Sequence, residues 1–365
     1  MTARPVRIDQ VIPSIVERDA VSHHALEAQR VLRSMGFVSE IYACTMGREL
    51  AGRVHPLREL PRERGDHQWV CYQASIGSPA ADAVASHPGL KLVNYHNISP
   101  AELVERWMPL LGEEVRLGRK QLVELAPLVE LGVAVSEFNR LELEEAGYRR
   151  SVVAPLTVDT ANFDYPPDPR AAERLRAARS LGGHDWLFVG QMLPHKAHQD
   201  VIKALVCARR MFDPDARLHL VGRESCPPYA DALRRYVAAL GLTGAVEFAG
   251  SVSPGELAAY YSTADVLVCC SDHEGFCAPL LEAMHHRLPV VAYGVAAVPE
   301  TVLDAGIVLP CKSPVLVATA VERVLTDRQL RHTLVRAGLE RTRAFSVEGA
   351  RRAFAQAIEQ MLQAT

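Results

Sequence analysis

The sequence of 365 residues contains no apolar run as long as the roughly 18 residues that a membrane-spanning helix needs. Its formal net charge is only −3, so no excess of basic residues indicates a nucleic-acid partner. Residues 1–5 lead into an expected strand and lack the apolar core of a secretory signal peptide. We therefore expect a cytoplasmic protein that does not bind nucleic acid.

Cysteine patterns that bind zinc or build a disulfide scaffold are also missing. The eight cysteines are scattered, and none forms a C-x-x-C pair. No acidic cluster of the kind that holds Mg²⁺ or Ca²⁺ is evident either. The sequence therefore predicts free, buried thiols in a reducing compartment, and no metal ion or other cofactor.

What the sequence does contain is enough apolar material for two domains of about 100–200 residues each, since 48% of its residues are hydrophobic. The segment Asp272–Met284 organises the chain. An apolar run, Val266–Cys270, leads into it, and a second run, Leu288–Tyr293, follows it; both are typical of buried parallel strands. Pro279 suits the first turn of a helix. Strand, glycine turn, helix and strand predict a βαβ unit of an α/β fold, which binds ligands at the carboxyl ends of its strands.

The turn in this unit has the features of an anion site. Free N–H groups would point outward at the positive end of the helix, from Gly275, Phe276, Cys277 and Ala278. Beside them, Glu274 would accept hydrogen bonds from sugar hydroxyls. Glu282, about two helical turns further along, would accept a second diol such as a ribose. The alternative is an ordinary βα unit with two solvated glutamates.

The amino-acid sequence of this segment favours the anion site over an ordinary βα unit. Ser271–Phe276 followed by Pro279–Met284 resembles the donor-binding signature of retaining nucleotide-sugar glycosyltransferases of family four, also called group 1. The resemblance implies a GT-B fold, in which two doubly wound parallel-sheet domains face each other across a cleft. It assigns residues 1–157 to the acceptor and residues 158–345 to the donor, with a last helix in 346–365 crossing back to the first domain.

Two further segments resemble the donor-binding part of this family. Gln191–Ala197 is similar to the diphosphate loop, which offers an Arg and, five residues later, a Lys. Lys196 matches, but Gln191 stands at the Arg position. Lys196 is therefore expected as the only side-chain cation of this loop, unless an Arg from elsewhere, such as Arg223, reaches in. We expect Lys196 to begin a helix that runs to about residue 211. Ser251 and Val252 fall where the family's backbone meets the nucleotide base.

The N-terminal half contributes a catalytic candidate and four acceptor candidates. His96 follows the expected strand Lys91–Tyr95, in a segment that resembles the one whose His lies against the donor sugar. With Glu274 and Lys196 it forms the predicted catalytic set. The acceptor candidates lie in loops after other expected strands, where helix capping or a tight turn is the alternative: Asp19, Ser22, Gly77 and Ser78.

Three more segments complete the expectations for this half. A helix over residues 101–126 places Trp107 and Leu110 near Arg116, Arg119 and Lys120. This patch either contacts a lipid-linked acceptor or the cytoplasmic face of a membrane, or combines core packing with a solvated basic face. Residues 131–136 are expected as the last strand of the first domain, and residues 152–163 as the linker.

The resemblance predicts a metal-independent retaining hexosyltransferase. It would move a hexosyl group from a UDP- or GDP-sugar to a hydroxyl of a glycan, a lipid-linked saccharide or a small natural product. Two alternatives within the fold are a nucleotide-sugar epimerase and a phosphorylase. A third is a catalytically weak binding or partner subunit, which Gln191 and the glycine-free loop after the first strand favour.

Overall fold

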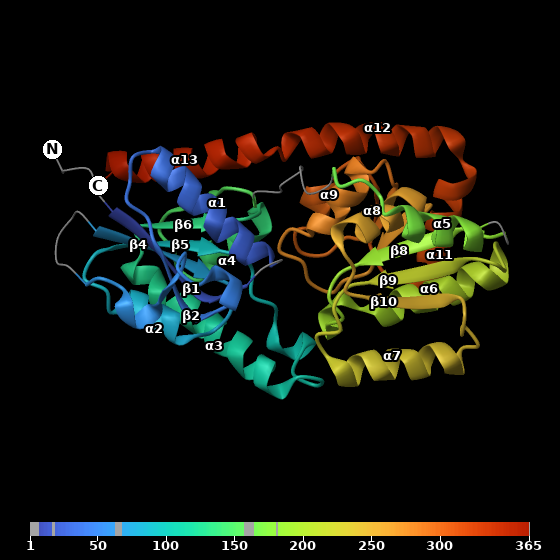
Figure 1. Ribbon diagram of the computed structural model, residues 1–365, viewed down its shortest axis with the longest axis horizontal. Helices are drawn as coiled ribbons and strands as arrows, with labels where there is room; N and C mark the ends of the chain where they lie inside the picture. Colours follow the sequence, from blue (N-terminus) through green and yellow to red (C-terminus); the bar gives the residue numbers. More distant parts are fainter. Residues whose placement is uncertain (1–6, 17–18, 63–67, 157–163, 180–181, 365) are drawn as a thin grey trace. The chain divides into compact units, whose positions relative to one another are not determined.

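The structure, a computed structural model, describes residues 7–16, 19–62, 68–156, 164–179 and 182–364. These residues form two compact units. Unit 1 consists of Met1–Glu105, Pro109–Val158 and Val347–Thr365, and unit 2 consists of Arg106–Met108 and Asp159–Ser346. Each unit is a parallel sheet with helices on both faces (Figure 1).

Unit 1 is built on a seven-stranded sheet in the order β3-β2-β1-β4-β5-β6-β7. The order reverses between β1 and β4, which is the arrangement of a doubly wound sheet. In β4 all seven residues are buried, as expected for a parallel strand covered on both faces. The strands are β1 Arg7–Ile15, β2 Ile41–Met46, β3 His55–Pro56, β4 Gln68–Ala74, β5 Leu90–Tyr95, β6 Leu131–Ala134 and β7 Ser151–Val153.

Helices cover the two faces of this sheet with separate apolar cores. One core contains Val84, Val115 and Leu143, from α2, α3 and α4. The other contains Leu32 of α1 and Ile358 of α13, so the C-terminal helix packs in unit 1 beside α1 (Figure 1). The helices are α1 Ala20–Ser34, α2 Pro79–Ala85, α3 Pro109–Leu125, α4 Glu137–Glu145 and α13 Val347–Ala364.

Unit 2 has a six-stranded parallel sheet in the order β10-β9-β8-β11-β12-β13. The order reverses between β8 and β11, so the predicted βαβ unit is confirmed as β11, α9 and β12 beside this switch point. Its strands are β8 Asp185–Val189, β9 Arg217–Val221, β10 Val246–Gly250, β11 Val266–Cys269, β12 Val290–Tyr293 and β13 Ile307–Leu309. The helices that follow or flank them are α5 Pro169–Arg179, α6 His198–Met211, α7 Pro227–Ala239, α8 Pro254–Thr263, α9 Ala278–His285, α10 Val298–Val302, α11 Pro314–Thr326 and α12 Arg328–Ala344.

Three sequence predictions about unit 1 are wrong. Residues 152 and 153 of the expected linker belong instead to the edge strand β7, Ser151–Val153, which pairs with β6. Residues 131–136 therefore do not contain the last strand. Residues 157–163 of the expected linker lie outside the described residues. The helix expected from residue 101 begins at Pro109, after a single turn at Ala101–Leu103, because a proline disfavours the helical conformation of the residue before it.

A buried charge network ties three neighbouring strands of unit 2 together. His219 on β9 contacts Asp185 on β8 through Nε2 at 3.1 Å and Glu247 on β10 through Nδ1 at 2.6 Å. Arg217 also binds Asp185, and Arg174 also binds Glu247. Burial opposes the charged imidazole, but the two carboxylates outweigh it and raise the pKa of His219 above its usual value.

We predict that this histidine makes the stability of the protein depend on pH above about 6.5, the pKa of a free histidine. A histidine whose pKa is raised by folding stabilises the fold fully at pH values below its unfolded pKa. This stabilisation is lost as pH rises through the folded pKa. The difference in unfolding free energy between acidic and alkaline buffer should therefore shrink in His219→Gln, by about 1.4 kcal/mol for each unit of pKa elevation. Urea unfolding across this range measures it, with the exposed His332→Gln as control. Equal pH slopes for the parent and His219→Gln would refute the prediction.

Candidate functional site

Three loops at the carboxyl edge of the unit 2 sheet are joined by backbone hydrogen bonds. Gly190 N–H donates to Val221 C=O and Gly222 N–H donates to Gly250 C=O, both at 2.9 Å, while Met192 N–H donates to Arg223 C=O at 2.8 Å. Gly222 has a φ of 150°, and a Cβ there would lie 1.9 Å from Gly190 O. The close approach of these loops therefore requires glycine. The backbone hydrogen bonds between these loops place Gln191 and Arg223 side by side.

The loop after β11 is fixed at both of its ends. Asp272 N–H donates to His195 C=O at 2.7 Å, which joins this loop to the one after β8. Ala297 N–H donates to Glu274 C=O at 3.1 Å, and the Thr301 hydroxyl donates to Phe276 C=O at 2.7 Å. These bonds place Glu274 and the start of α9 at the same edge of the sheet as the loops after β8 and β9.

Lys196 and Glu274, which are 78 residues apart, form the charged centre of this edge. Lys196 Nζ donates to both carboxylate oxygens of Glu274 at 2.8 Å. Burial opposes the carboxylate, but the attraction and hydrogen bonds of Lys196 outweigh it, so the pKa of Glu274 is lowered. Burial likewise opposes the ammonium, yet Glu274 raises the pKa of Lys196. Both groups are therefore charged at neutral pH.

The position of Lys196 corrects one expectation. Lys196 is not the first residue of α6 but ends the single turn η6, Pro194–Lys196. Ala197 follows with a left-handed φ of 50° and separates this turn from α6. The lysine consequently leaves the helix axis and reaches across to Glu274.

The predicted anion-binding N–H groups lie next to this pair, at the start of α9. Within the described residues no acceptor binds the backbone N–H of Gly275, Phe276, Cys277 or Ala278. The cap residue Cys277 has a left-handed φ of 64°, and no side chain caps the helix. Four free donors at a helix N-terminus, beside an ammonium group, form a site that suits a phosphate group.

Gln191 has a cationic neighbour, Arg223, which the sequence indicated only as one Arg that would have to reach in from elsewhere. Its Oε1 accepts hydrogen bonds from the Ser225 hydroxyl at 2.8 Å and from Arg223 Nη2 at 3.3 Å. A guanidinium group therefore stands beside the position where the family resemblance expects an Arg. No local motif indicates Arg223, because the pairing of β8 with β9 brings it there.

The remaining donor candidates lie in two places. Glu282, on α9, accepts a hydrogen bond of 2.6 Å from the Tyr261 hydroxyl; burial raises the pKa of this carboxyl, and that bond opposes the rise. Ser251 and Val252 follow β10 and line a cavity of about 570 Å³ together with Arg174 and Tyr260. The structure thus brings the backbone predicted for base contact to the rim of an open cavity.

In unit 1, His96 ends a chain of buried amide groups. Its Nε2 lies 2.6 Å from Gln73 Oε1, which also accepts from Asn94, and Gln73 Nε2 donates to Gln10 at 2.6 Å. Since Gln73 Oε1 is an acceptor, Nε2 of His96 bears the proton. Nδ1 has no partner within the described residues. Burial, and then the neighbouring ring of His24 at 5.1 Å, hold the pKa of His96 well below its usual value.

The four acceptor candidates have structural roles. Asp19 caps α1 by accepting from the N–H and the hydroxyl of Ser22, at 2.9 and 2.8 Å. Ser78 caps α2, and its backbone is held by Gln121 at 3.0 Å on both sides. A Cβ on Gly77 would lie 2.5 Å from the backbone nitrogen of Gly118, so this glycine packs closely against α3. Acceptor contact by Asp19, Ser22, Gly77 and Ser78 stays a prediction.

The mixed patch on α3 is mostly paired on its basic side. Arg116 binds Glu105, Arg119 binds Glu142 at 2.8 Å, and Lys120 lies 3.4 Å from Glu124. Leu110 nevertheless exposes 76% of its surface. In the described part of the chain, none of the helices combines the length and the hydropathy that crossing a membrane requires.

Comparison with known proteins begins with the family model described as "Glycosyl transferases group 1", which residues 174–341 match. A GDP-mannose-dependent alpha-(1-6)-phosphatidylinositol monomannoside mannosyltransferase of Mycobacterium tuberculosis is 34% identical over 196 residues, which are 51% of this chain and 49% of that protein. A D-inositol 3-phosphate glycosyltransferase of Kineococcus radiotolerans is 30% identical over 244 residues, 63% of this chain and 56% of that protein. The chain spans about half the length of the curated relatives that it matches.

Solved structures extend the likeness to both units. Anabaena HepE, determined in complex with UDP and glucose, has a TM-score of 0.77 at 16% identity and covers 97% of this chain and 100% of its own. WaaG, a glycosyltransferase involved in lipopolysaccharide biosynthesis, has a TM-score of 0.71 at 15% identity, with 96% and 98% covered. At such identities the likeness shows the fold alone. The predicted GT-B fold is confirmed.

We predict that His96 is neutral, with its proton on Nε2, throughout the pH range in which the protein is folded and active. Its low pKa and its bond to Gln73 require this. Two-bond ¹H–¹⁵N spectra of ¹⁵N-histidine-labelled protein report the tautomer directly, and His96→Gln assigns the signal. The partner ring of His24 should titrate at a pKa of about 4. A His96 signal that titrates near the ordinary value of about 6.5 would contradict the buried amide arrangement.

Proposed function

We propose that this chain, whose residues 174–341 match the model of the group 1 glycosyl transferases, moves a hexosyl group from a UDP- or GDP-linked donor to a hydroxyl acceptor. The proposed reaction retains the anomeric configuration and needs no metal cofactor. One observation carries it: the Lys196–Glu274 pair lies beside the free N–H groups at the start of α9. A cation and a carboxylate thus stand next to each other, as a charged phosphate and a polyhydroxyl sugar require.

The groups proposed to bind the nucleotide sugar divide into those that contact the phosphates and those that contact the sugars. Lys196 has three N–H donors, and Glu274 takes two of them, which leaves one for a phosphate oxygen. Arg223 and the N–H groups of Gly275 to Ala278 supply further fixed donors for the charge that builds up on the leaving diphosphate. Glu282 keeps one carboxylate oxygen free of Tyr261, and this oxygen suits a ribose hydroxyl.

The state of Glu274 supports a retaining route without a covalent intermediate. A carboxylate whose two oxygens both accept from Lys196 is a weak nucleophile, since the ammonium stabilises its charge. In the proposed reaction Glu274 therefore holds sugar hydroxyls, and the departing phosphate oxygen takes the acceptor's proton. His96, neutral and with a free Nδ1, is proposed to support the oxocarbenium-like sugar.

The acceptor and the compartment are part of the same proposal. The acceptor offers a hydroxyl of a glycan, a lipid-linked saccharide or a small natural product, and unit 1 provides its contacts. All eight cysteines are free, which supports a reducing, cytoplasmic compartment. The exposed Leu110 on α3 supports peripheral contact with a membrane surface.

Donor turnover by the purified protein tests the proposal. A mass-spectrometric screen of UDP- and GDP-hexoses should reveal hydrolysis of one donor, accelerated by an acceptor. Glu274→Gln should lower turnover by about 10²-fold, because its contacts strengthen in the transition state. Glu282→Gln should mainly raise the donor KM.

The exposed Glu340→Gln on α12 is the matched control and should behave like the parent. Release of an epimerised nucleotide sugar would identify an epimerase. Binding without any turnover would identify a partner subunit. Near-parental kinetics of both Glu274→Gln and Glu282→Gln would reject the site.

Binding of the nucleotide diphosphate gives a separate prediction. Lys196→Ala and Arg223→Ala should each weaken UDP or GDP binding about ten- to hundredfold, since a charge-assisted hydrogen bond contributes roughly 1.5–3 kcal/mol. Gln191→Arg should bind as tightly as the parent or tighter. Calorimetry measures all three, and Arg336→Ala, on the exposed face of α12, is the control. If Arg223→Ala binds like the parent, Arg223 does not replace the expected Arg.

A further inference from the structure

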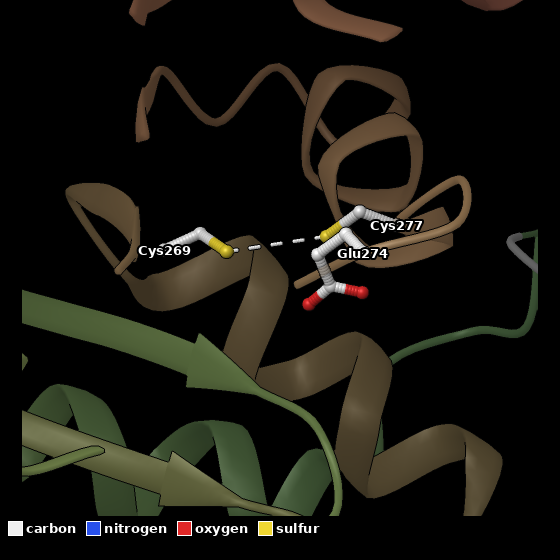
Figure 2. Close-up of side chains that lie close together, drawn as sticks. All are labelled: Cys269, Glu274 and Cys277. Carbon is white, nitrogen blue, oxygen red and sulfur yellow. Dashed lines mark hydrogen bonds between the residues drawn. The ribbon is translucent and has the colours of Figure 1, made fainter. Parts of the chain in front are cut away.

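Two cysteines and Glu274 form a compact buried cluster in unit 2. The possible ligand atoms of Cys269, Glu274 and Cys277, two sulfurs and a carboxylate oxygen, all lie within 4.8 Å of one another. Cys269 ends β11, Cys277 caps α9, and Glu274 lies in the loop between them. Figure 2 shows the two sulfur atoms pointing toward each other, with the carboxylate of Glu274 beside them.

The spacing of the two sulfurs matches ligands of one metal ion better than a disulfide. Cys269 Sγ and Cys277 Sγ are 4.0 Å apart. Two thiolates bound to a tetrahedral Zn²⁺ at about 2.3 Å are separated by about 3.8 Å. A disulfide bond requires about 2.0 Å, so the sulfurs would have to approach each other by roughly 2 Å. Binding of both sulfurs to one ion therefore needs little movement of the strand end or the helix cap.

We propose that Cys269, Cys277 and one oxygen of Glu274 bind a thiophilic divalent cation of the Zn²⁺ class. The fourth position of the tetrahedron is left to water. The ligands follow the spacing C-x₄-E-x₂-C, which differs from the C-x-x-C pattern that sequence analysis searched for. The site forms because the left-handed cap at Cys277 turns its side chain back toward the end of β11.

The charge balance of the cluster supports this assignment. Without metal, two neutral thiols accompany the ion pair of Glu274 and Lys196. Binding of Zn²⁺ releases two thiol protons into the solvent, so two positive charges enter and two leave. The net charge of the buried site is unchanged, and the desolvation penalty of an added charge is avoided. Lys196 can keep its hydrogen bond to the carboxylate oxygen that does not bind the metal.

This metal site would be inhibitory if the proposed function is correct. Glu274 is the carboxylate that the proposed function assigns to the donor sugar, and the metal would occupy it. The ion would then exclude the donor instead of assisting the reaction. Metal binding itself does not depend on this step, because it can be measured without any donor.

Titration of the reduced, chelator-treated full-length protein with Co²⁺ tests the site. We expect one Co²⁺ per chain, a thiolate-to-cobalt absorption band in the near ultraviolet, and displacement by Zn²⁺. Zinc binding should release about two protons, so the affinity should rise about 100-fold per pH unit while both thiols are protonated. Cys269→Ser and Cys277→Ser should each weaken Co²⁺ binding more than about 100-fold. This exceeds the roughly 10- to 100-fold loss expected for a residue that only hydrogen-bonds a metal ligand.

Cys270→Ala is the matched control, because this neighbouring thiol is buried in an apolar core of unit 2 that does not contain Cys269 or Cys277, and its loss should leave binding unchanged. Glu274→Gln should weaken binding while keeping the absorption band of the two thiolates. Thermal unfolding checks that each variant is folded. Three outcomes would overturn the proposal. The absorption band could be unchanged in both Cys269→Ser and Cys277→Ser, or Cys270→Ala could lose Co²⁺ affinity to the same extent as these variants. The third outcome is a Cys269–Cys277 disulfide, formed with oxidised glutathione, in a protein that does not bind Co²⁺. Metal binding in a protein without donor turnover would reject the proposed function alone, and turnover without metal binding would reject the metal site alone.

Discussion

The ion pair between Lys196 and Glu274 is the interaction on which the edge of unit 2 depends. It joins the loop after β8 to the loop after β11, on the two strands where the order of the sheet reverses. Both groups are largely removed from water, and loss of one partner from such a pair costs about 3–5 kcal/mol. The pair also decides the chemistry of its neighbours. It keeps Glu274 ionised and presents one ammonium proton beside the free N–H groups of α9.

Local features of the sequence predicted the part of this site that is local in the chain. The apolar runs before and after residues 272–284 became β11 and β12, and the start of α9 near Pro279 follows from the chemistry of proline. The meeting of Lys196 with Glu274 was predictable only through the family resemblance, because 78 residues separate them. From the sequence, Arg223 could be named only as one Arg that would have to reach in from elsewhere. Its position depends on the pairing of β8 with β9, which no periodicity in the sequence specifies.

The other failures also come from contacts that the sequence does not encode locally. The close packing of Gly77 against Gly118 of α3 joins two segments that are 41 residues apart in the chain. The strand β7 has three residues, too few for a periodic pattern, and β6 supplies its hydrogen bonds. Cys269 and Cys277 meet because a left-handed residue turns the chain, and a motif search for fixed cysteine spacings does not include that turn.

Gln191 and Arg223 show that a missing motif residue is not the same as a missing charge. In a parallel sheet the carboxyl ends of adjacent strands lie next to each other, about 4.8 Å apart, so either loop can deliver a guanidinium group to the same place. Here the loop after β9 brings Arg223 to Gln191 Oε1. Two cations, Lys196 and Arg223, therefore stand at this edge, the number that the family motif itself provides. The argument for a weak, non-catalytic subunit rested partly on the loss of one of them. With the charge restored from the neighbouring strand, the glycine-free loop of unit 1 is left as the feature that favours that alternative, and the Asp19 cap on α1 explains how this loop ends without glycine.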